Sequence, residues 1–177
     1  MNLPNLLSVI RLCMIPITAI LFSEDRVLAA TLVFVLACLT DILDGVIARK
    51  FNLITDLGKI LDPLADKGMH ITMLVSMAIA NLMPWIVVIV LFVKELMMCV
   101  GGAVLYKAKT VIGANSYGKI STVVTSSCVV LILLFHEIFP QAVIFALQWL
   151  PLLFALYAFI KYSQVFAEIK KHNNMEQ

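Results

Sequence analysis

Charged residues are scarce in this sequence. Of its 177 residues, 14% are Asp, Glu, Lys or Arg, whereas 62% belong to the hydrophobic set. Soluble domains carry about 25% charged and about 45–50% apolar residues, and a chain of this length cannot bury so much apolar surface in one water-soluble core. The low charge therefore excludes an ordinary soluble domain. The formal net charge of +2 is too small to indicate nucleic-acid binding.

Cysteine is sparse too. The four Cys residues lie within apolar stretches and show no paired spacing: Cys13, Cys38, Cys99 and Cys128. Such positions favour buried thiols over disulfides or a zinc site. Alternation of polar and apolar residues is also missing, because the apolar runs are continuous, and this excludes a transmembrane β-barrel.

What the sequence does contain is a series of long apolar runs. A helix needs about 20 residues to cross the hydrocarbon core of a bilayer, which is about 30 Å thick. The runs predict an all-α integral membrane protein with six transmembrane helices in a single domain over residues 1–177. The expected helices cover residues 3–22, 27–50, 63–80, 85–106, 118–135 and 142–166. The many Met and Phe side chains are expected to face lipid.

Helix-start and turn signals set the limits of these helices. Asp62 followed by Pro63 is typical of a helix start, with Asp as the N-cap and Pro at the first helical position. Residues 81–84, Asn-Leu-Met-Pro, predict a turn, and residues 107–117 predict a basic loop. Residues 51–60 form an amphipathic stretch that is expected to lie at the membrane interface.

The basic residues predict the orientation in the membrane. If the N-terminus is cytoplasmic, nine Lys or Arg residues fall in cytoplasmic segments and one, Arg26, falls outside. The nine are Arg49, Lys50, Lys59, Lys107, Lys109, Lys119, Lys161, Lys170 and Lys171. Positive charge concentrates on the cytoplasmic side of membrane proteins, so both termini and the segment from Arg49 to Lys67 are expected to face the cytoplasm.

Four acids stand out within this apolar chain. Asp41 and Asp44 lie three residues apart on one expected helix, and Asp62 and Asp66 lie four apart on the next. Residues with these spacings share one helix face. The short connection makes the two helices antiparallel neighbours, so the four carboxylates are expected to converge at one depth near the cytoplasmic side.

Carboxylates at membrane depth are costly and repel one another. Two divalent cations would balance four carboxylates, and oxygen ligands without nearby His or Cys favour Mg²⁺, with Mn²⁺ or Ca²⁺ as other occupants. Gly45, one turn after Asp41, allows close approach of a ligand, and Arg49 offers a phosphate-binding fork. The pattern predicts a two-metal site for a pyrophosphate, and the alternative is a solvated rim of helix-end acids paired with Lys and Arg.

These residues resemble the signature of the CDP-alcohol phosphatidyltransferase family, D-x-x-D-G-x-x-A-R-x8-G-x-x-x-D-x-x-x-D. The eight fixed positions are present as Asp41, Asp44, Gly45, Ala48, Arg49, Gly58, Asp62 and Asp66. The resemblance implies an integral membrane enzyme, usually dimeric, that moves a phosphatidyl group from CDP-diacylglycerol to an alcohol and releases CMP. It also fits a bacterial cell membrane as the location, with the active site facing the cytoplasm.

The resemblance implies a role for each matching residue. Asp41 and Asp62 would bridge two metal ions, Asp44 would complete the first ion's ligands, and Asp66 the second's. Asp66 would also be the general base that takes the acceptor's hydroxyl proton, in keeping with the need of a poor nucleophile for a base within hydrogen-bond reach. The residues that would contact the CDP moiety are Gly45, Arg49 and Thr55.

The N-terminal stretch from Pro4 to Arg11 resembles the opening of family members, P-N-x-x-[ST]-x-x-R, which lies beside the nucleotide site. Asn5, Ser8 and Arg11 fall roughly on one helix face. Asn5 and Arg11 are therefore expected to contact the CDP-lipid, and the alternative is a helix cap with an Arg11 that extends toward the interface.

The acceptor is harder to infer from sequence. Lys94-Glu95 and the stretch from Gly118 through Lys119 to Thr122 resemble the acceptor side of phosphatidylglycerophosphate synthases, which use glycerol 3-phosphate. Lys94 and Lys119 would then bind its phosphate, and the alternative for Lys94 is an ion pair with Glu95 or another helix. That group tends to carry a further Arg-Glu pair where this chain has residues 101–103, Gly-Gly-Ala, so a cardiolipin synthase that uses phosphatidylglycerol is the second hypothesis.

Two other classes of protein stay open. Acids within the membrane also mark the ion path of a small cation transporter, but that class predicts broken helices at matching positions of two halves, which the sequence does not show. A membrane scaffold without catalysis is the third alternative. The partners expected for the enzyme are CDP-diacylglycerol, an alcohol acceptor, membrane lipid and a second copy of the chain.

Overall fold

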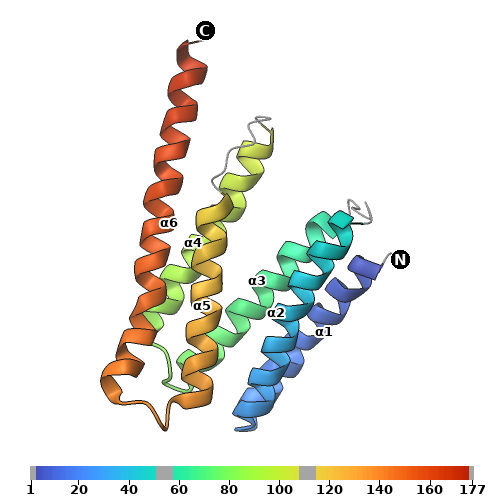
Figure 1. Ribbon diagram of the computed structural model, residues 1–177, viewed down its shortest axis with the longest axis vertical. Helices are drawn as coiled ribbons and strands as arrows, with labels where there is room; N and C mark the ends of the chain where they lie inside the picture. Colours follow the sequence, from blue (N-terminus) through green and yellow to red (C-terminus); the bar gives the residue numbers. More distant parts are fainter. Residues whose placement is uncertain (1–2, 51–57, 108–114, 176–177) are drawn as a thin grey trace. The chain divides into compact units, whose positions relative to one another are not determined.

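The protein is helical throughout the part of the chain that the structure describes. This computed structural model describes residues 3–50, 58–107 and 115–175 (Figure 1). Its six helices are α1 (Leu3–Ser23), α2 (Val27–Lys50), α3 (Gly58–Ile79), α4 (Trp85–Lys107), α5 (Asn115–Phe135) and α6 (Gln141–Met175). The all-α class and the number of helices are as predicted from the sequence.

Some helix limits differ from the prediction. α3 begins at Gly58, so Asp62 and Pro63 lie inside it and the predicted cap at Asp62 is wrong. Pro63 is the sixth residue of α3, in its second turn, where it removes one main-chain hydrogen bond without ending the helix, so the Asp-Pro pair did not fix the start. α6 continues to Met175, where a polar tail was expected. The interfacial stretch overlaps α3 from Gly58, and its residues 51–57 lie outside the described part.

The described helices fall into two compact units. The first comprises Met1–Met83 with Leu133–His136, and the second Pro84–Ile132 with Glu137–Gln177. The first unit therefore holds α1, α2 and α3, and the second holds α4, α6 and most of α5. The expectation of one membrane domain stays a prediction.

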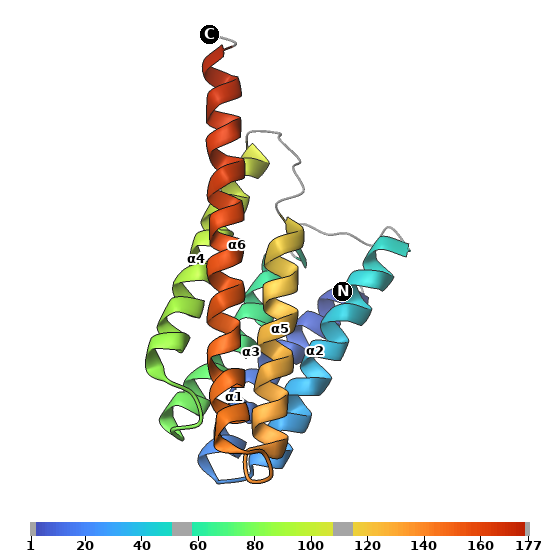
Figure 2. The same ribbon diagram turned by 60° about the vertical axis from the view of Figure 1, so that its left-hand side comes forward.

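In the first unit, α1 packs against both α2 and α3. α1 and α3 run in the same direction, and α2 runs antiparallel to both (Figures 1 and 2). Contacts between side chains fix the register of α1 on α3: the Thr18 hydroxyl donates to the sulfur of Met69 over 3.6 Å. This arrangement places the N-terminal half of α1 beside the C-terminal end of α2 and the start of α3.

Small and unbranched side chains make up part of the core of the first unit. Ala30, Ala37 and Ala65 are fully buried, and small residues let helices approach closely within membranes. Met69, Met73 and Met77 follow one another at helical spacing on α3 and are also buried. The expectation that methionines face lipid is wrong for these three, because the flexible thioether fills irregular gaps between the helices.

α1 and α3 end in the same type of hydrogen-bonded turn. Asp25 and Asn81 adopt left-handed conformations, with φ of 59° and 58°. After α3, the Leu82 N–H donates to the Met77 carbonyl and the Asn81 N–H to the Ala78 carbonyl, which is the Schellman pattern. The same pair of bonds closes α1 around Asp25. The turn predicted over residues 81–84 is confirmed.

In the second unit, α4 packs against α6. Gly118 of α5 lies against the Met98 side chain of α4, and a Cβ added at Gly118 would lie 2.0 Å from the terminal carbon of Met98. The glycine therefore permits close contact between these two helices.

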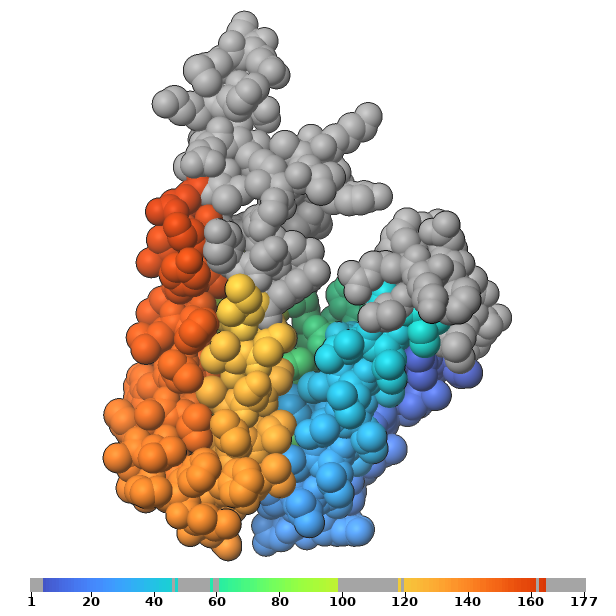
Figure 3. Space-filling view, in the orientation of Figure 1, coloured from blue at the N-terminus to red at the C-terminus, as the bar shows by residue number. Residues whose placement is uncertain are grey.

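Large apolar side chains cover the outer surfaces of both units. On α2 they recur along the helix as Leu28, Leu32, Leu36, Leu39 and Leu43, each at least half exposed, and α2 forms much of the visible face of the first unit in Figure 3. Three described segments are long and apolar enough to cross a membrane: Asn5–Ser23, Val27–Gly45 and Gln141–Lys161. Exposed apolar surface of this extent is typical of a protein whose solvent is lipid.

Candidate functional site

Arg11 of α1 joins the two acids of α2. Its Nη1 donates to Asp41 Oδ1 over 2.7 Å, and its Nη2 donates to Asp44 Oδ2. The Arg11 side chain is 1% exposed and that of Asp44 5%, whereas that of Asp41 is 39% exposed. The i,i+3 spacing on α2 therefore presents both carboxylates to one guanidinium, which is planar and suited to such a fork. Asp41 is the acid of this pair that stays accessible.

Ser8, one turn before Arg11, reaches the other acidic helix. Its hydroxyl donates to Asp62 Oδ1 of α3, and Ser8 itself is fully buried. Asn5, a further turn back, is 6% exposed. The polar face predicted for residues 5–11 is thus a buried face that α1 turns toward α2 and α3.

Asp66 lies one turn after Asp62 and pairs with His70 on the same helix. His70 Nδ1 is 3.3 Å from Asp66 Oδ1 and 3.0 Å from the Asp66 main-chain oxygen. The imidazole meets the Phe34 ring of α2 edge-on, with 5.4 Å between the ring centroids. Asp66 remains about a third exposed.

The acids of α2 and α3 also interact across the helix pair. Asp41 repels Asp66, and Asp44 repels Asp62. Each of these hydrogen bonds and ion pairs involves one oxygen of the carboxylate concerned. The sequence-predicted acids therefore lie at one end of the first unit, where α1 supplies partners for Asp41, Asp44 and Asp62 and His70 of α3 is the partner of Asp66.

For the other predicted site residues, the structure describes the helix position or nothing at all. Gly45 lies in α2 directly after Asp44 and is half-buried. Arg49 belongs to the last turn of α2 and Lys119 to the second turn of α5, but both side chains lie outside the described part. Thr55 falls in the segment 51–57, which is also outside it.

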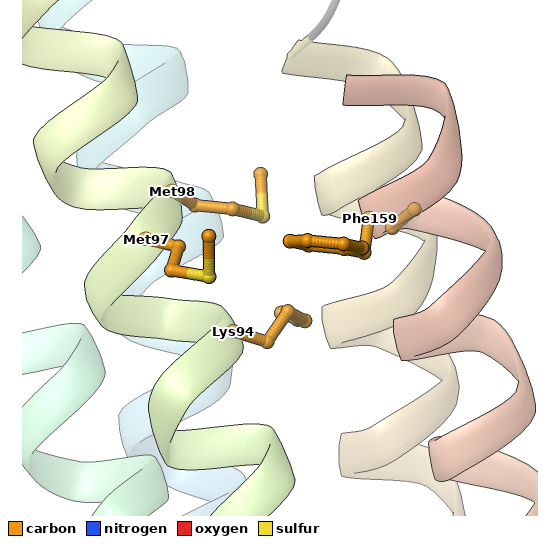
Figure 4. A pocket seen from close by; sticks show the side chains of 5 residues that line it. Lys94, Met97, Met98 and Phe159 are labelled. Atoms are coloured by element: carbon orange, nitrogen blue, oxygen red, sulfur yellow. The ribbon is translucent and has the colours of Figure 1, made fainter. Parts of the chain in front are cut away.

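Lys94 of α4 is buried within the second unit. Its Nζ lies 2.6 Å from Glu95 Oε1 and donates to Ser121 Oγ of α5 over 3.2 Å. The side chain is 5% exposed and borders a pocket of about 50 Å³ between α4 and α6 (Figure 4). The remaining lining is apolar and comes from Met97, Met98, Ala158 and Phe159. The ion pair with Glu95, one of the two sequence-based alternatives, is the arrangement observed.

Two features of the site were missed from the sequence. The partner of Asp66 is His70, and its i,i+4 spacing was a readable signal. The ion pairs of Arg11 with Asp41 and Asp44 could not be predicted from the sequence, because these acids lie 30 and 33 positions after Arg11.

Comparison with known proteins identifies the family. The family model for CDP-alcohol phosphatidyltransferase matches residues 1–157. The chain belongs to this family. The match covers both units and includes all eight signature residues, so the resemblance inferred from the sequence is confirmed.

Relatives in this family carry a consistent name. Similar proteins from Aquifex aeolicus (36% identical over 129 residues) and Bacillus subtilis (37% over 136) are each called CDP-diacylglycerol–glycerol-3-phosphate 3-phosphatidyltransferase. These matches cover 71% and 68% of this chain and 72% and 70% of the relatives. A Rickettsia typhi protein of the same name is 51% identical over 69 residues, and that match spans 37% of this chain and 39% of the relative. The named relatives are therefore transferases that use CDP-diacylglycerol.

CDP-alcohol phosphatidyltransferases generally use divalent metal ions. The acids of this chain fit such an ion in donor type, because hard cations prefer carboxylate oxygen, and in charge, because four carboxylates carry more charge than the Arg11 guanidinium that contacts two of them. Among the described residues, however, no three acidic, His or Cys side chains are gathered as a ready metal-binding cluster. The α2 acids instead hold Arg11.

Proposed function

We propose that this chain transfers the phosphatidyl group of CDP-diacylglycerol to glycerol 3-phosphate and releases CMP. The observation that carries the proposal is that α1 contacts Asp41, Asp44 and Asp62 at the positions of the family signature, with Asp66, the fourth signature acid, one turn after Asp62. The names of the relatives support the choice of both substrates.

The chemistry is a direct displacement at phosphorus. The acceptor hydroxyl oxygen forms a bond to the phosphorus that carries the diacylglycerol, and the bond from this phosphorus to the oxygen of the CMP phosphate breaks. The hydroxyl proton passes to a carboxylate, and CMP leaves with the electron pair of the broken bond. No covalent enzyme intermediate is required.

Asp66 is proposed as the base. Its carboxylate is partly exposed and held by His70, so a substrate hydroxyl can approach it, and proton removal is what an alcohol needs to attack at neutral pH. Asp41, Asp44, Asp62 and Asp66 would hold two Mg²⁺ ions, which would stabilise negative charge on phosphate oxygens.

The lipid-linked nucleotide is assigned to residues beside the acids. Gly45, Arg49 and Thr55 are proposed to contact the CDP moiety, with Asn5 and Arg11 on the adjoining face of α1. Asn5 and Arg11 are buried on that face, which supports a role close to the acids.

The acceptor phosphate is assigned to Lys94 and Lys119. A buried Lys94 with Ser121 beside it offers donors to an anion, and relatives named for glycerol 3-phosphate support that acceptor over phosphatidylglycerol. The cardiolipin alternative is therefore not favoured.

We further infer six membrane spans with both termini cytoplasmic, a homodimer, and a site that faces the cytoplasm of a bacterial cell membrane. The support is the nine-to-one distribution of basic residues around the expected spans, the three apolar segments long enough to cross, and the bacterial relatives.

The test is an acceptor panel. The full chain, purified in detergent, is incubated with CDP-diacylglycerol, Mg²⁺ and radiolabelled glycerol 3-phosphate, phosphatidylglycerol, inositol phosphate or serine, and CMP and the lipid product are measured. We expect product with glycerol 3-phosphate. Product with phosphatidylglycerol alone would identify a cardiolipin synthase, and no CMP with any acceptor would refute phosphatidyl transfer.

Two Asp→Asn variants make the assay specific. Asp66→Asn should lower CMP release by about 10²-fold or more, the usual range for loss of a general base, while CDP-lipid binding is largely retained. Asp25→Asn is the matched control, because Asp25 is an exposed acid in a left-handed turn that Asn also adopts. Equal turnover in the two variants would exclude Asp66 as the base.

A further inference from the structure

We propose that Arg11 is a built-in counter-ion for the acids of α2, which competes with a divalent cation for Asp41 and Asp44. The inference rests on the proposed metal-dependent function and concerns the same site. It assigns to Arg11 a role in setting cation affinity, in addition to any contact with the CDP-lipid.

Arg11 occupies carboxylate oxygens of Asp41 and Asp44 that a cation would also bind. Its two terminal nitrogens each donate to a different acid, over 2.7 Å to Asp41 and by a close contact to Asp44. A carboxylate oxygen that accepts a guanidinium N–H has fewer lone pairs left for a cation. The guanidinium charge also repels a cation that approaches the same oxygens. A divalent ion at these acids must therefore displace or shift Arg11.

The acids are what hold Arg11 in place. Its Nε is buried and has no hydrogen-bond partner among the described residues, and the side chain is 1% exposed. A buried cation needs its anionic partners, and removal of one side of such a pair leaves an uncompensated charge. Without metal, Arg11 and the two acids are therefore expected to stabilise one another.

Ser8 provides an internal comparison. It lies one turn before Arg11 and donates to Asp62 of the other acidic helix, so the same face of α1 supports both sets of acids. The Ser8 hydroxyl is neutral, whereas Arg11 carries a full charge. Competition with a cation is therefore expected from Arg11 and not from Ser8.

The experiment measures cation binding without lipid substrate. Wild-type protein, Arg11→Met, Arg11→Lys and the exposed control Arg26→Met are reconstituted in lipid nanodiscs and titrated with Mn²⁺, with free Mn²⁺ followed by electron paramagnetic resonance. Thermal unfolding is recorded with and without Mg²⁺. Arg26 lies in the turn after α1 and is exposed, so its substitution removes one charge away from the acids.

We expect Arg11→Met to bind Mn²⁺ about tenfold more tightly than wild type, which corresponds to about 1.4 kcal/mol. Its unfolding temperature should be lower than that of wild type without metal and should rise more on addition of Mg²⁺. Arg11→Lys, which keeps the charge but not the fork, should bind with intermediate affinity. Arg26→Met should match wild type.

Equal or weaker Mn²⁺ binding by Arg11→Met overturns the inference, as does the absence of Mn²⁺ binding by every variant. If Arg11→Met does not fold, Arg11→Lys decides alone: affinity no tighter than wild type overturns the inference. CMP release by the wild-type chain is measured separately. An active wild type without a gain in affinity at Arg11 refutes the counter-ion role and leaves phosphatidyl transfer standing.

Discussion

His70 donates from Nδ1 to the residue one turn before it, Asp66. The two Asp66 atoms near Nδ1, a carboxylate oxygen at 3.3 Å and the main-chain oxygen at 3.0 Å, are both acceptors, which favours the tautomer with the proton on Nδ1. Phe34 packs edge-on against the imidazole. His70 is therefore a positioning residue that fixes the orientation of the Asp66 carboxylate.

Replacement of His70 should slow turnover without weakening substrate binding. We expect His70→Leu to lower kcat about tenfold, with KM for both substrates within about twofold, because misorientation of Asp66, the proposed base, would affect chiefly the transition state. His70→Asn, whose amide N–H can replace Nδ1–H, should recover much of the loss. His136→Leu, in the turn after α5, is the control. A change in KM alone in His70→Leu would contradict the positioning role.

Loss of the Ser8 hydroxyl should destabilise the first unit. Ser8→Ala removes the hydrogen bond from α1 to Asp62, which is only partly buried, so we expect a loss of about 1 kcal/mol, the usual net value of one such bond. Thermal unfolding in detergent should show the effect. Ser23→Ala is the matched control, since the Ser23 hydroxyl is exposed and bonds only within its own helix turn, to the Ile20 carbonyl. A similar loss of stability in both variants would show that the bond to Asp62 contributes little.

Gly68 permits α1 and α3 to pack closely. A Cβ at Gly68 would lie 2.8 Å from the Cδ1 atom of Ile15, so Gly68→Val should destabilise the protein by about 1–3 kcal/mol through overpacking. Ile15→Ala removes the opposing atoms and should restore part of the stability in the double variant. Unfolding of the two single variants and the double variant gives the coupling directly, and strictly additive losses would disprove the contact as the cause.

Lys94 and Glu95 should behave as a buried pair. Lys94→Met should destabilise the second unit because it removes the cation that lies 2.6 Å from the Glu95 carboxylate, which is 17% exposed; loss of one partner of a buried ion pair costs up to about 3–5 kcal/mol. Lys94→Met with Glu95→Gln removes both charges and should regain most of this stability. If Lys94 also binds the acceptor phosphate, KM for glycerol 3-phosphate should remain raised in the double variant; a wild-type KM there would exclude that role.

The hydrophobic runs and the spacing of a few acids were enough to predict much of this protein. Continuous apolar segments near 20 residues long indicate membrane helices; the described residues form six helices, and three of these hold a segment long and apolar enough to cross a membrane. Asp41 and Asp44, three apart, and Asp62 and Asp66, four apart, had to share helix faces because helical periodicity is local. The signature built on them was specific enough to identify the family before any fold was known.

Only the tertiary structure decided what each acid touches. The chain order gives no reason for Arg11 to meet Asp41 and Asp44, or for Ser8 to meet Asp62, because these contacts depend on how three helices pack and in which register. The same packing buries the α3 methionines that composition assigned to lipid. Periodicity specifies which residues share a face, but the fit of side chains between helices determines which faces meet.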